Sequence, residues 1–418
     1  MIENFVSMLP GGYQGLALNT INYLILFMPV WLPIFLIFIL WHKWLEYVRT
    51  KFANKQDYKL LEIKLPNEIK KTPLAMELFL NALIQPGGAG TWHKKYVEGK
   101  SRAEFSLEMV SLEGQVKFFI WTRGVWKDLI ETQIYAQYPD VEIFEVPNYT
   151  SFIKFDPSAL SMWGAEFKLS REDFYPIKTY VDYDMEAKGV KEEEKIDPIT
   201  PIIEFLGSVG QGQQVWLQII VRAHKKERRK ALTWKERWNK KVWSEEEDWG
   251  GQSKKAIKDL IKEAVKTDDE NSIMPRMMTK GETNIISAIE RSVAKLGFDC
   301  NIRGMYLSEY DKFNVINISS LVGTFRQFNS NELNGFKIAK AVDYDYPWQD
   351  FRKIRENRNK IKMFNEYKRR DFSADYSPFV LNIEELATIY HFPGGVAQTP
   401  SFARLLSKKA EAPFNLPI

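Results

Sequence analysis

One long hydrophobic run dominates the beginning of the chain. Tyr23 to Trp41 (YLILFMPVWLPIFLIFILW) contains no charged side chain over nineteen positions. As a helix that rises ~1.5 Å per residue, this run reaches about 28 Å, close to the ~30 Å of a bilayer's hydrocarbon core. The pattern predicts a transmembrane helix over residues 21–43, preceded by an extracytoplasmic segment over residues 1–20.

The charges that flank the run predict its orientation. Lys43, Arg49, Lys51 and Lys55 follow the run, and no Lys or Arg precedes it. Because basic residues beside a span stay on the cytoplasmic side, we expect a single-pass protein of the cell (inner) membrane with its N-terminus outside and its body in the cytoplasm. A cleavable signal peptide would need a basic start and small residues at its end. The alternative of a buried core helix is disfavoured, because core helices rarely run this long without a polar face.

Strand-like and helix-like periods then alternate in a fixed order. Alternation and turn signals predict strands, and apolar spacing of three and four predicts helices. The order is β-α-β-β-α-β, which is typical of a ferredoxin-like domain and which we assign to residues 56–150. Its expected elements are, in order, Tyr58–Leu65, Thr72–Ile84, Phe105–Val110, Gln115–Trp121, Lys127–Tyr138 and Val141–Val146.

A second copy of this order is expected over residues 151–310. Its leading strand material is Glu166–Leu169 and Lys178–Tyr183. A helix, a strand, a second helix and a final strand follow at Ile199–Leu206, Gln214–Ala223, Glu282–Leu296 and Cys300–Leu307. A charged, helix-forming insertion over residues 225–280 interrupts the copy. The sequence therefore predicts an α+β protein with two tandem ferredoxin-like domains behind a transmembrane helix.

The remaining residues, 311–418, have weaker periodicity. They contain a strand-like segment (NVINIS), a basic helix, a short helix at Glu384–Tyr390 and a tail rich in Pro and Gly. We expect this region to be extended at its end and to dock on a neighbouring protein.

Composition limits the chemistry that the chain can carry. Its 418 residues are 45% hydrophobic and 27% charged, a normal globular balance, with a net charge of only +4. A single cysteine, Cys300, excludes intramolecular disulfides and suits a cytoplasmic body. Gly99-Lys100-Ser101 lacks the first glycine of a phosphate loop, and the four histidines are scattered. We expect no cofactor, no metal site, no catalytic residue and no enzyme activity.

The best candidate for an interaction surface is a basic and aromatic stretch within the insertion. Arg222 to Lys241 contains ten basic residues and two acids. Phosphates of anionic lipid or of nucleic acid are the expected partners, with tryptophans that stack or anchor. The candidate contacts are Arg222, Lys225, Lys226, Arg228, Arg229, Lys230, Trp234, Trp238, Lys240 and Lys241. The alternative is a solvated helical hairpin whose tryptophans form their own small core.

A second basic segment also has two possible roles, one as an interaction surface and one within the structure. Arg352 to Arg370 carries nine basic residues and two acids. It could contact an anionic partner, or it could pair within the protein with the acidic segment Glu245 to Asp248.

Several segments together resemble a known group of proteins. The stretches FSLEMVSLEGQVKFFIWTRG, ETQIYAQYPDVEIFEV, DFYPIKTYVDY, DPITPIIEFLGSVGQGQQVWLQIIVR and LNIEELATIYHFPGGVAQTPSFARLLSKKAEAPFNLPI are similar to the N-terminal, non-motor region of type IV secretion and conjugation-type ATPases in patescibacterial (candidate phyla radiation) membrane proteins. The resemblance implies a domain of unknown function that works with a FtsK/HerA-like or coupling-type ATPase. It also implies a ring, that is, a homo-oligomer.

The chain departs from the longer members of this group because it ends at APFNLPI, where their motor would begin. We therefore expect no motor in this chain and carry over no catalytic residue. The leading hypothesis is a non-catalytic, membrane-anchored docking component of a type IV secretion-like or DNA-translocation system that binds a separate ATPase. The alternative is a membrane-tethered nucleic-acid-binding module that uses basic segments 222–241 and 352–370.

Overall fold

The fold is seen in a computed structural model, which describes residue 23 and residues 25–66, 69, 71–85, 91–185, 196–225, 229–231, 244–246, 249–265, 278–344, 346, 348–372 and 378–394. The predicted N-terminal segment, the C-terminal tail and much of the insertion lie outside these residues. The chain divides into two compact units: Met1–Asp57 with Gly87–Ser101, and Tyr58–Pro86 with Arg102–Ile418.

The first unit is built on helix α3 (Met28–Asn54) and the short helix α5 (Trp92–Tyr96). By length and composition, α3 could cross a membrane, and its apolar stretch has no protein cover. The prediction of an apolar helix here is confirmed, but the helix continues beyond residue 43 to Asn54. Its later turns contact the α5 segment, where the Trp44 indole nitrogen donates to the Tyr96 carbonyl at 3.0 Å.

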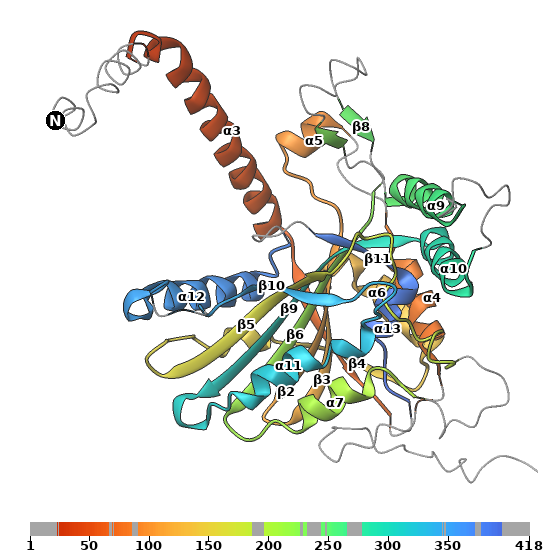
Figure 1. Cartoon of the computed structure of the whole chain (residues 1–418). Coiled ribbons are helices and arrows are strands. Elements are labelled where there is room, and N and C mark those ends of the chain that lie inside the picture. The colour runs from red at the N-terminus through yellow and green to blue at the C-terminus, as the bar shows by residue number, and fades with distance from the viewer. Residues whose placement is uncertain are drawn as a thin grey trace, which may run out of the picture. The chain divides into compact units, whose positions relative to one another are not determined.

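The second unit is organised around one antiparallel sheet (Figure 1). Eight strands lie in the order β10-β5-β9-β6-β2-β3-β1-β4, and β11 also pairs with β9. The strands are β1 (Tyr58–Lys64), β2 (Glu104–Leu112), β3 (Gln115–Arg123), β4 (Glu142–Val146), β5 (Leu160–Leu169), β6 (Gln213–Ala223), β9 (Gly297–Glu309), β10 (Phe336–Ala341) and β11 (Phe379–Asn382). Within the insertion, β7 (Arg229–Ala231) and β8 (Ser244–Glu246) pair with each other.

The helices of this unit pack on the sheet or on one another. They are α4 (Pro73–Leu83), α6 (Lys127–Gln137), α7 (Thr200–Gly207), α9 (Trp249–Val265), α10 (Lys280–Ala294), α11 (Ile316–Gly323), α12 (Ile354–Arg369) and α13 (Ile383–Ile389). The predicted strands and helices between residues 56 and 150 are confirmed to within a few residues at their ends. The basic helix near 352–370 is confirmed as α12, and the short helix near 384–390 as α13.

Two element predictions are wrong. Lys178–Tyr183 forms no strand, because side chains take up its backbone donors: Thr179 N donates to Asp182 and Tyr180 N donates to Thr388 Oγ1. The segment NVINIS is not strand-like but begins α11, despite its β-branched residues. Packing outweighs propensity here, since Leu321 of α11 is fully buried.

The two halves of the sheet share one strand order. In chain order, the strands of the first half are β1, β2, β3 and β4, and those of the second are β5, β6, β9 and β10. From its outer edge inward, each half reads fourth, first, third, second. The predicted final strand Cys300–Leu307 is β9, which holds the third place, and β10 holds the fourth. The boundaries expected at residues 150 and 310 coincide with no break in the sheet, which continues to β11.

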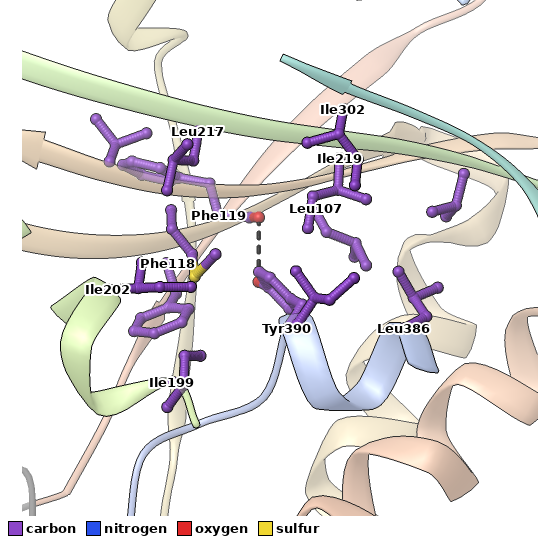
Figure 2. Packing of buried hydrophobic residues seen from close by; sticks show 14 of the residues in the cluster. Leu107, Phe118, Phe119, Ile199, Ile202, Leu217, Ile219, Ile302, Leu386 and Tyr390 are labelled. Carbon is purple, nitrogen blue, oxygen red and sulfur yellow. Dashed lines mark hydrogen bonds between the residues drawn. The ribbon is translucent and has the colours of Figure 1, made fainter. Parts of the chain in front are cut away.

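Buried apolar side chains pack on both faces of the sheet, and α13 covers one of these faces (Figure 2). Figure 2 shows Tyr390 beneath the strands, near Leu107 and Phe118. The Tyr390 hydroxyl donates to the Phe119 carbonyl at 3.3 Å, and its ring meets Phe118 edge-on. Every residue of α13 is buried, so this short helix is a core element and not a surface appendage.

Truncation of α13 should therefore destabilise the whole unit. Leu386 has no exposed surface, and we expect Leu386→Ala to lower the free energy of unfolding by about 2–5 kcal/mol because it leaves a cavity. Urea unfolding of the full chain in detergent measures this. The control is Leu78→Ala, the same change on α4 at a side chain that is 49% exposed, where about 0.5 kcal/mol or less is expected. Equal losses in the two variants would contradict the role of α13.

Candidate functional site

Only two of the predicted contact residues have described side chains. Arg222 lies on β6, and Lys225 follows that strand and is exposed. Arg229 and Lys230 belong to β7. The other predicted contacts, Lys226, Arg228, Trp234, Trp238, Lys240 and Lys241, lie outside the described residues.

Arg222 is part of a charged cluster at the point where the insertion leaves the sheet. It lies directly across from Asp299 of β9 and from Glu104 of β2. The Asp299 carboxylate accepts from Arg222 at 3.3 Å and from His224 Nδ1 at 2.6 Å, and Arg102 lies 3.2 Å from it. The cluster is therefore two arginines and a histidine gathered around one nearly buried carboxylate.

The surroundings of this cluster determine its charge. Burial raises the pKa of Asp299, but the hydrogen bond from His224 and the two arginines outweigh this and hold the pKa below its usual range. The Arg222 guanidinium also lies 4.0 Å from the centre of the Phe372 ring. Arg222 is thus held by carboxylates and an aromatic ring of its own chain, and it does not present the bare cation that the sequence suggested for a phosphate partner.

A second set of polar residues crosses the middle of the sheet on the face opposite α13. Glu108 of β2 pairs with Gln218 of β6, Gln218 pairs with Arg303 of β9, and Arg303 pairs with Glu166 of β5. All four are buried. Gln218 donates to Glu108 at 3.1 Å, and Arg303 donates to Glu166 at 2.8 Å and to Gln218 at 3.5 Å. We call these four residues the polar row.

The end of α12 covers the polar row. Arg370 donates to both oxygens of Glu108, at 2.8 and 3.0 Å, and both side chains are nearly inaccessible to solvent. Ser106 and Tyr149 also donate to Glu108, at 2.6 and 2.8 Å, and Tyr149 contacts Tyr367 through their hydroxyls at 2.9 Å. Burial and the Glu108 charge raise the pKa of Tyr149 well above its usual value.

Sequence reasoning missed the polar row, although a signal existed. Each member is a lone polar residue between apolar neighbours in a strand, as in FSLEMV, VWLQII and NIRGMY. Such a residue in a strand that is buried on both faces needs a partner inside the protein. Arg370, at the end of a basic segment, is that partner and does not belong to an exposed basic surface.

The chain matches a known protein family. A family described as a domain of unknown function (DUF8128) matches residues 48–404. The chain belongs to the DUF8128 family. The match spans both halves of the sheet, the polar row and α13. No curated protein matches the chain.

A third polar cluster joins α10 to α13 in the DUF8128 fold. The Glu384 carboxylate of α13 lies 3.4 Å from the Arg291 guanidinium of α10. It also lies 2.9 Å from the ammonium group of Lys295, the residue that follows α10. Its neighbour Glu385 forms a capping box with Asn382, and burial raises the pKa of Glu385 to about 8. These contacts hold α10 against the core.

The described residues suit structural chemistry better than metal binding. His391 Nε2 lies 2.9 Å from Asp197, and its Nδ1 lies 2.9 Å from the Ala387 carbonyl. This buried histidine therefore fixes the segment after α13 against the segment before α7. Among the residues that the structure describes, no group of three or more His, Cys, Asp or Glu side chains could hold a metal ion.

One end of the sheet carries exposed apolar side chains among charged ones. The loops after β2, before β6 and after β9 meet there: Gly212 N donates to Glu113, and the Gln213 side chain donates to the Lys312 carbonyl. Four exposed apolar side chains lie on or beside these loops, and we call them the loop-end surface: Phe152, Tyr310, Val315 and Ile316. A shallow pocket lies alongside, with Leu112, Tyr149 and Phe152 in its lining.

The charged cluster should make the protein sensitive to acid. Because the folded pKa of Asp299 lies below the unfolded value of about 3.9, its stabilisation is present above that pH and is lost as the pH falls through the folded pKa. We expect Asp299→Asn to be less stable at pH 7 and to lose part of the acid dependence below about pH 4. Unfolding measured from pH 2 to 7 tests this. Asp311→Asn, at an exposed acid, should leave the profile unchanged.

The buried pair under α12 should be costly to break from one side. Arg370→Met leaves the Glu108 carboxylate buried without its cation, and we expect a loss of about 3–5 kcal/mol in unfolding free energy. The double variant with Glu108→Gln should lose less than the sum of the two single changes. Lys312→Met removes a cation from the exposed pair with Glu309 and should cost less than about 1 kcal/mol. Additive losses for Glu108 and Arg370 would refute the coupling.

Proposed function

We propose that this DUF8128 protein is a non-catalytic, membrane-anchored docking component. The observation that carries the proposal is α3, which is long and apolar enough to cross a bilayer and has an apolar stretch without protein cover. Such a surface is stable in lipid or against another chain, but not in water. In this proposal α3 crosses the cell membrane once, with the N-terminus outside and the body in the cytoplasm, as the basic residues after the span favour.

The body in this proposal is a rigid platform made of two tandem ferredoxin-like units. The repeated strand order in the two halves of the sheet supports this. The second ferredoxin-like unit would consist of β5, α7, β6, β9, α11 and β10. The insertion that contains α9 and α10 then lies between the second and third strands of that unit. The polar row joins the two units across their β2–β6 border, which favours one body over two hinged ones.

The partner in this proposal is a separate secretion-type ATPase, as the sequence resemblance implies. The loop-end surface supports a docking role, because Tyr310 and Ile316 are 71% and 69% exposed, and exposed apolar patches commonly mark interaction sites. The rival, a tethered nucleic-acid-binding module, is weakened at Arg222, which carboxylates of its own chain engage.

Crosslinking in intact membranes tests the docking role. A photoreactive amino acid at Tyr310 should capture a phosphate-loop ATPase, and the same probe at Val125 should not. Val125 is 82% exposed and lies just beyond the opposite end of β3, so it is an equally accessible apolar control. Capture of no protein at Tyr310, or of the same proteins at both sites, would count against the loop-end surface. Capture of nucleic acid alone would favour the rival.

A further inference from the structure

An exposed aromatic and basic corner precedes and begins α12. Trp348, Phe351 and Ile354 are 78%, 76% and 64% exposed, which is unusual for three large apolar side chains within seven positions. The basic residues Arg352, Lys353 and Arg358 are interleaved with them and are also exposed. We call these six residues the α12 tip. In Figure 1, α12 runs alongside β5 of the sheet.

The backbone of the tip is held in an unusual shape. Arg352 and Lys353 both have left-handed backbone angles, with φ of 59° and 57°. Such angles are unfavourable for residues with a Cβ and persist only where the surroundings impose them. Here the Asp350 carboxylate accepts from the backbone nitrogens of Arg355 and Glu356 at 2.9 and 2.7 Å, which fixes the start of the helix.

The cations of the tip keep their charge available. Among the described residues, no ion pair joins Arg352, Lys353 or Arg358 to an acid. The two acids within the same stretch are otherwise engaged: Glu356 pairs with Lys360 at 2.6 Å, and Asp350 caps the helix. Asp343, on the approach to the tip, is exposed and is the nearest remaining described acid in the sequence. The tip therefore combines apolar rings with unneutralised positive charge.

We propose that the α12 tip docks on the anionic surface of the membrane to which the chain is tethered. Bilayer interfaces accept Trp and Phe rings at headgroup depth and attract Lys and Arg through anionic lipids, so one surface satisfies both halves of the tip. This inference rests on the proposed membrane tether. The tether favours lipid as the occupant, because only sixteen residues, His42 to Asp57, separate the apolar run from β1. Thirteen of them are helical, so together they reach about 30 Å at most.

A single fluorophore can report this docking. The only natural cysteine, Cys300, is fully buried, so a thiol probe on Phe351→Cys labels the tip selectively. The full chain is reconstituted in vesicles of phosphatidylcholine alone, or of equal parts phosphatidylcholine and phosphatidylglycerol, with spin-labelled acyl chains as quencher. We expect quenching at residue 351 in the anionic vesicles and its reversal by salt. Absence of quenching there would overturn the proposal.

Matched charge variants separate the tip from general electrostatics. The variant Arg352→Gln, Lys353→Gln, Arg358→Gln should lower the ratio of docked to undocked protein about fivefold per residue, or on the order of 100-fold in all. The variant Lys254→Gln, Lys255→Gln, Lys258→Gln makes the same charge change at exposed lysines of α9 and should leave the ratio unchanged. Equal effects from the two variants would overturn the assignment to the tip.

Two further readouts distinguish the ways in which the proposal can fail. If alkaline carbonate leaves the chain in the vesicles while the probe at 351 stays unquenched, the tether holds and docking is wrong. If carbonate extracts the chain, the membrane anchor of the proposed function is wrong, and quenching by externally added anionic vesicles still decides docking. A probe that responds to duplex DNA in detergent but not to anionic lipid would assign the tip to nucleic acid and overturn the lipid proposal.

Discussion

The bond between Glu108 and Arg370 is the constraint on which the larger, sheet-containing unit of the chain depends. A carboxylate in the middle of a buried sheet is costly unless charge and hydrogen bonds replace water, and Glu108 accepts five hydrogen bonds, two of them from Arg370. Arg370 comes from the end of α12, 262 positions later in the chain. The polar row therefore cannot be completed until the C-terminal part of the chain has folded against the sheet. This makes the two halves and the C-terminal helices one cooperative body.

The same bond sets the position of α12. The helix is 16 residues long, about 24 Å, and only its later turns are buried, at Met363, Phe364, Glu366 and Tyr367. The C-terminal end of α12 is fixed on the polar row, and the helix holds its N-terminal end at a distance from that row. The tip is thus placed by contacts at the opposite end of the helix. A surface held in this way loses little conformational entropy when it binds, which suits a docking role.

Local patterns in the sequence predicted much of the secondary structure, but long-range polar pairing was beyond their reach. The first six elements follow from period and turn chemistry, because each is a short segment with one buried face. In the second half, the helix predicted at Glu282–Leu296 is confirmed as α10, and α11, which follows β9, was not predicted because its β-branched residues resemble a strand. The partner of Arg370 was missed. Its basic segment was expected to contact an anionic partner or to pair with Glu245 to Asp248, because charge runs are visible in a sequence but the partner of each charge is not. The cluster around Asp299 likewise joins residues on or beside β2, β6 and β9 that only the register brings together.

The distribution of charge favours a scaffold whose surfaces carry its function. The buried ionic groups described above, at Asp299, Glu108, Glu384 and Asp197, each meet a basic group of the same chain at hydrogen-bonding distance. Networks that satisfy themselves in this way hold elements together and specify one arrangement. The features that have no such internal partner are on the surface. They are an apolar helix suited to lipid, exposed apolar side chains at one end of the sheet, and the basic and aromatic α12 tip. A chain that binds partners on these surfaces needs a rigid scaffold to hold them in place. The sheet, whose central strands are joined by the hydrogen bonds of the polar row, provides that scaffold.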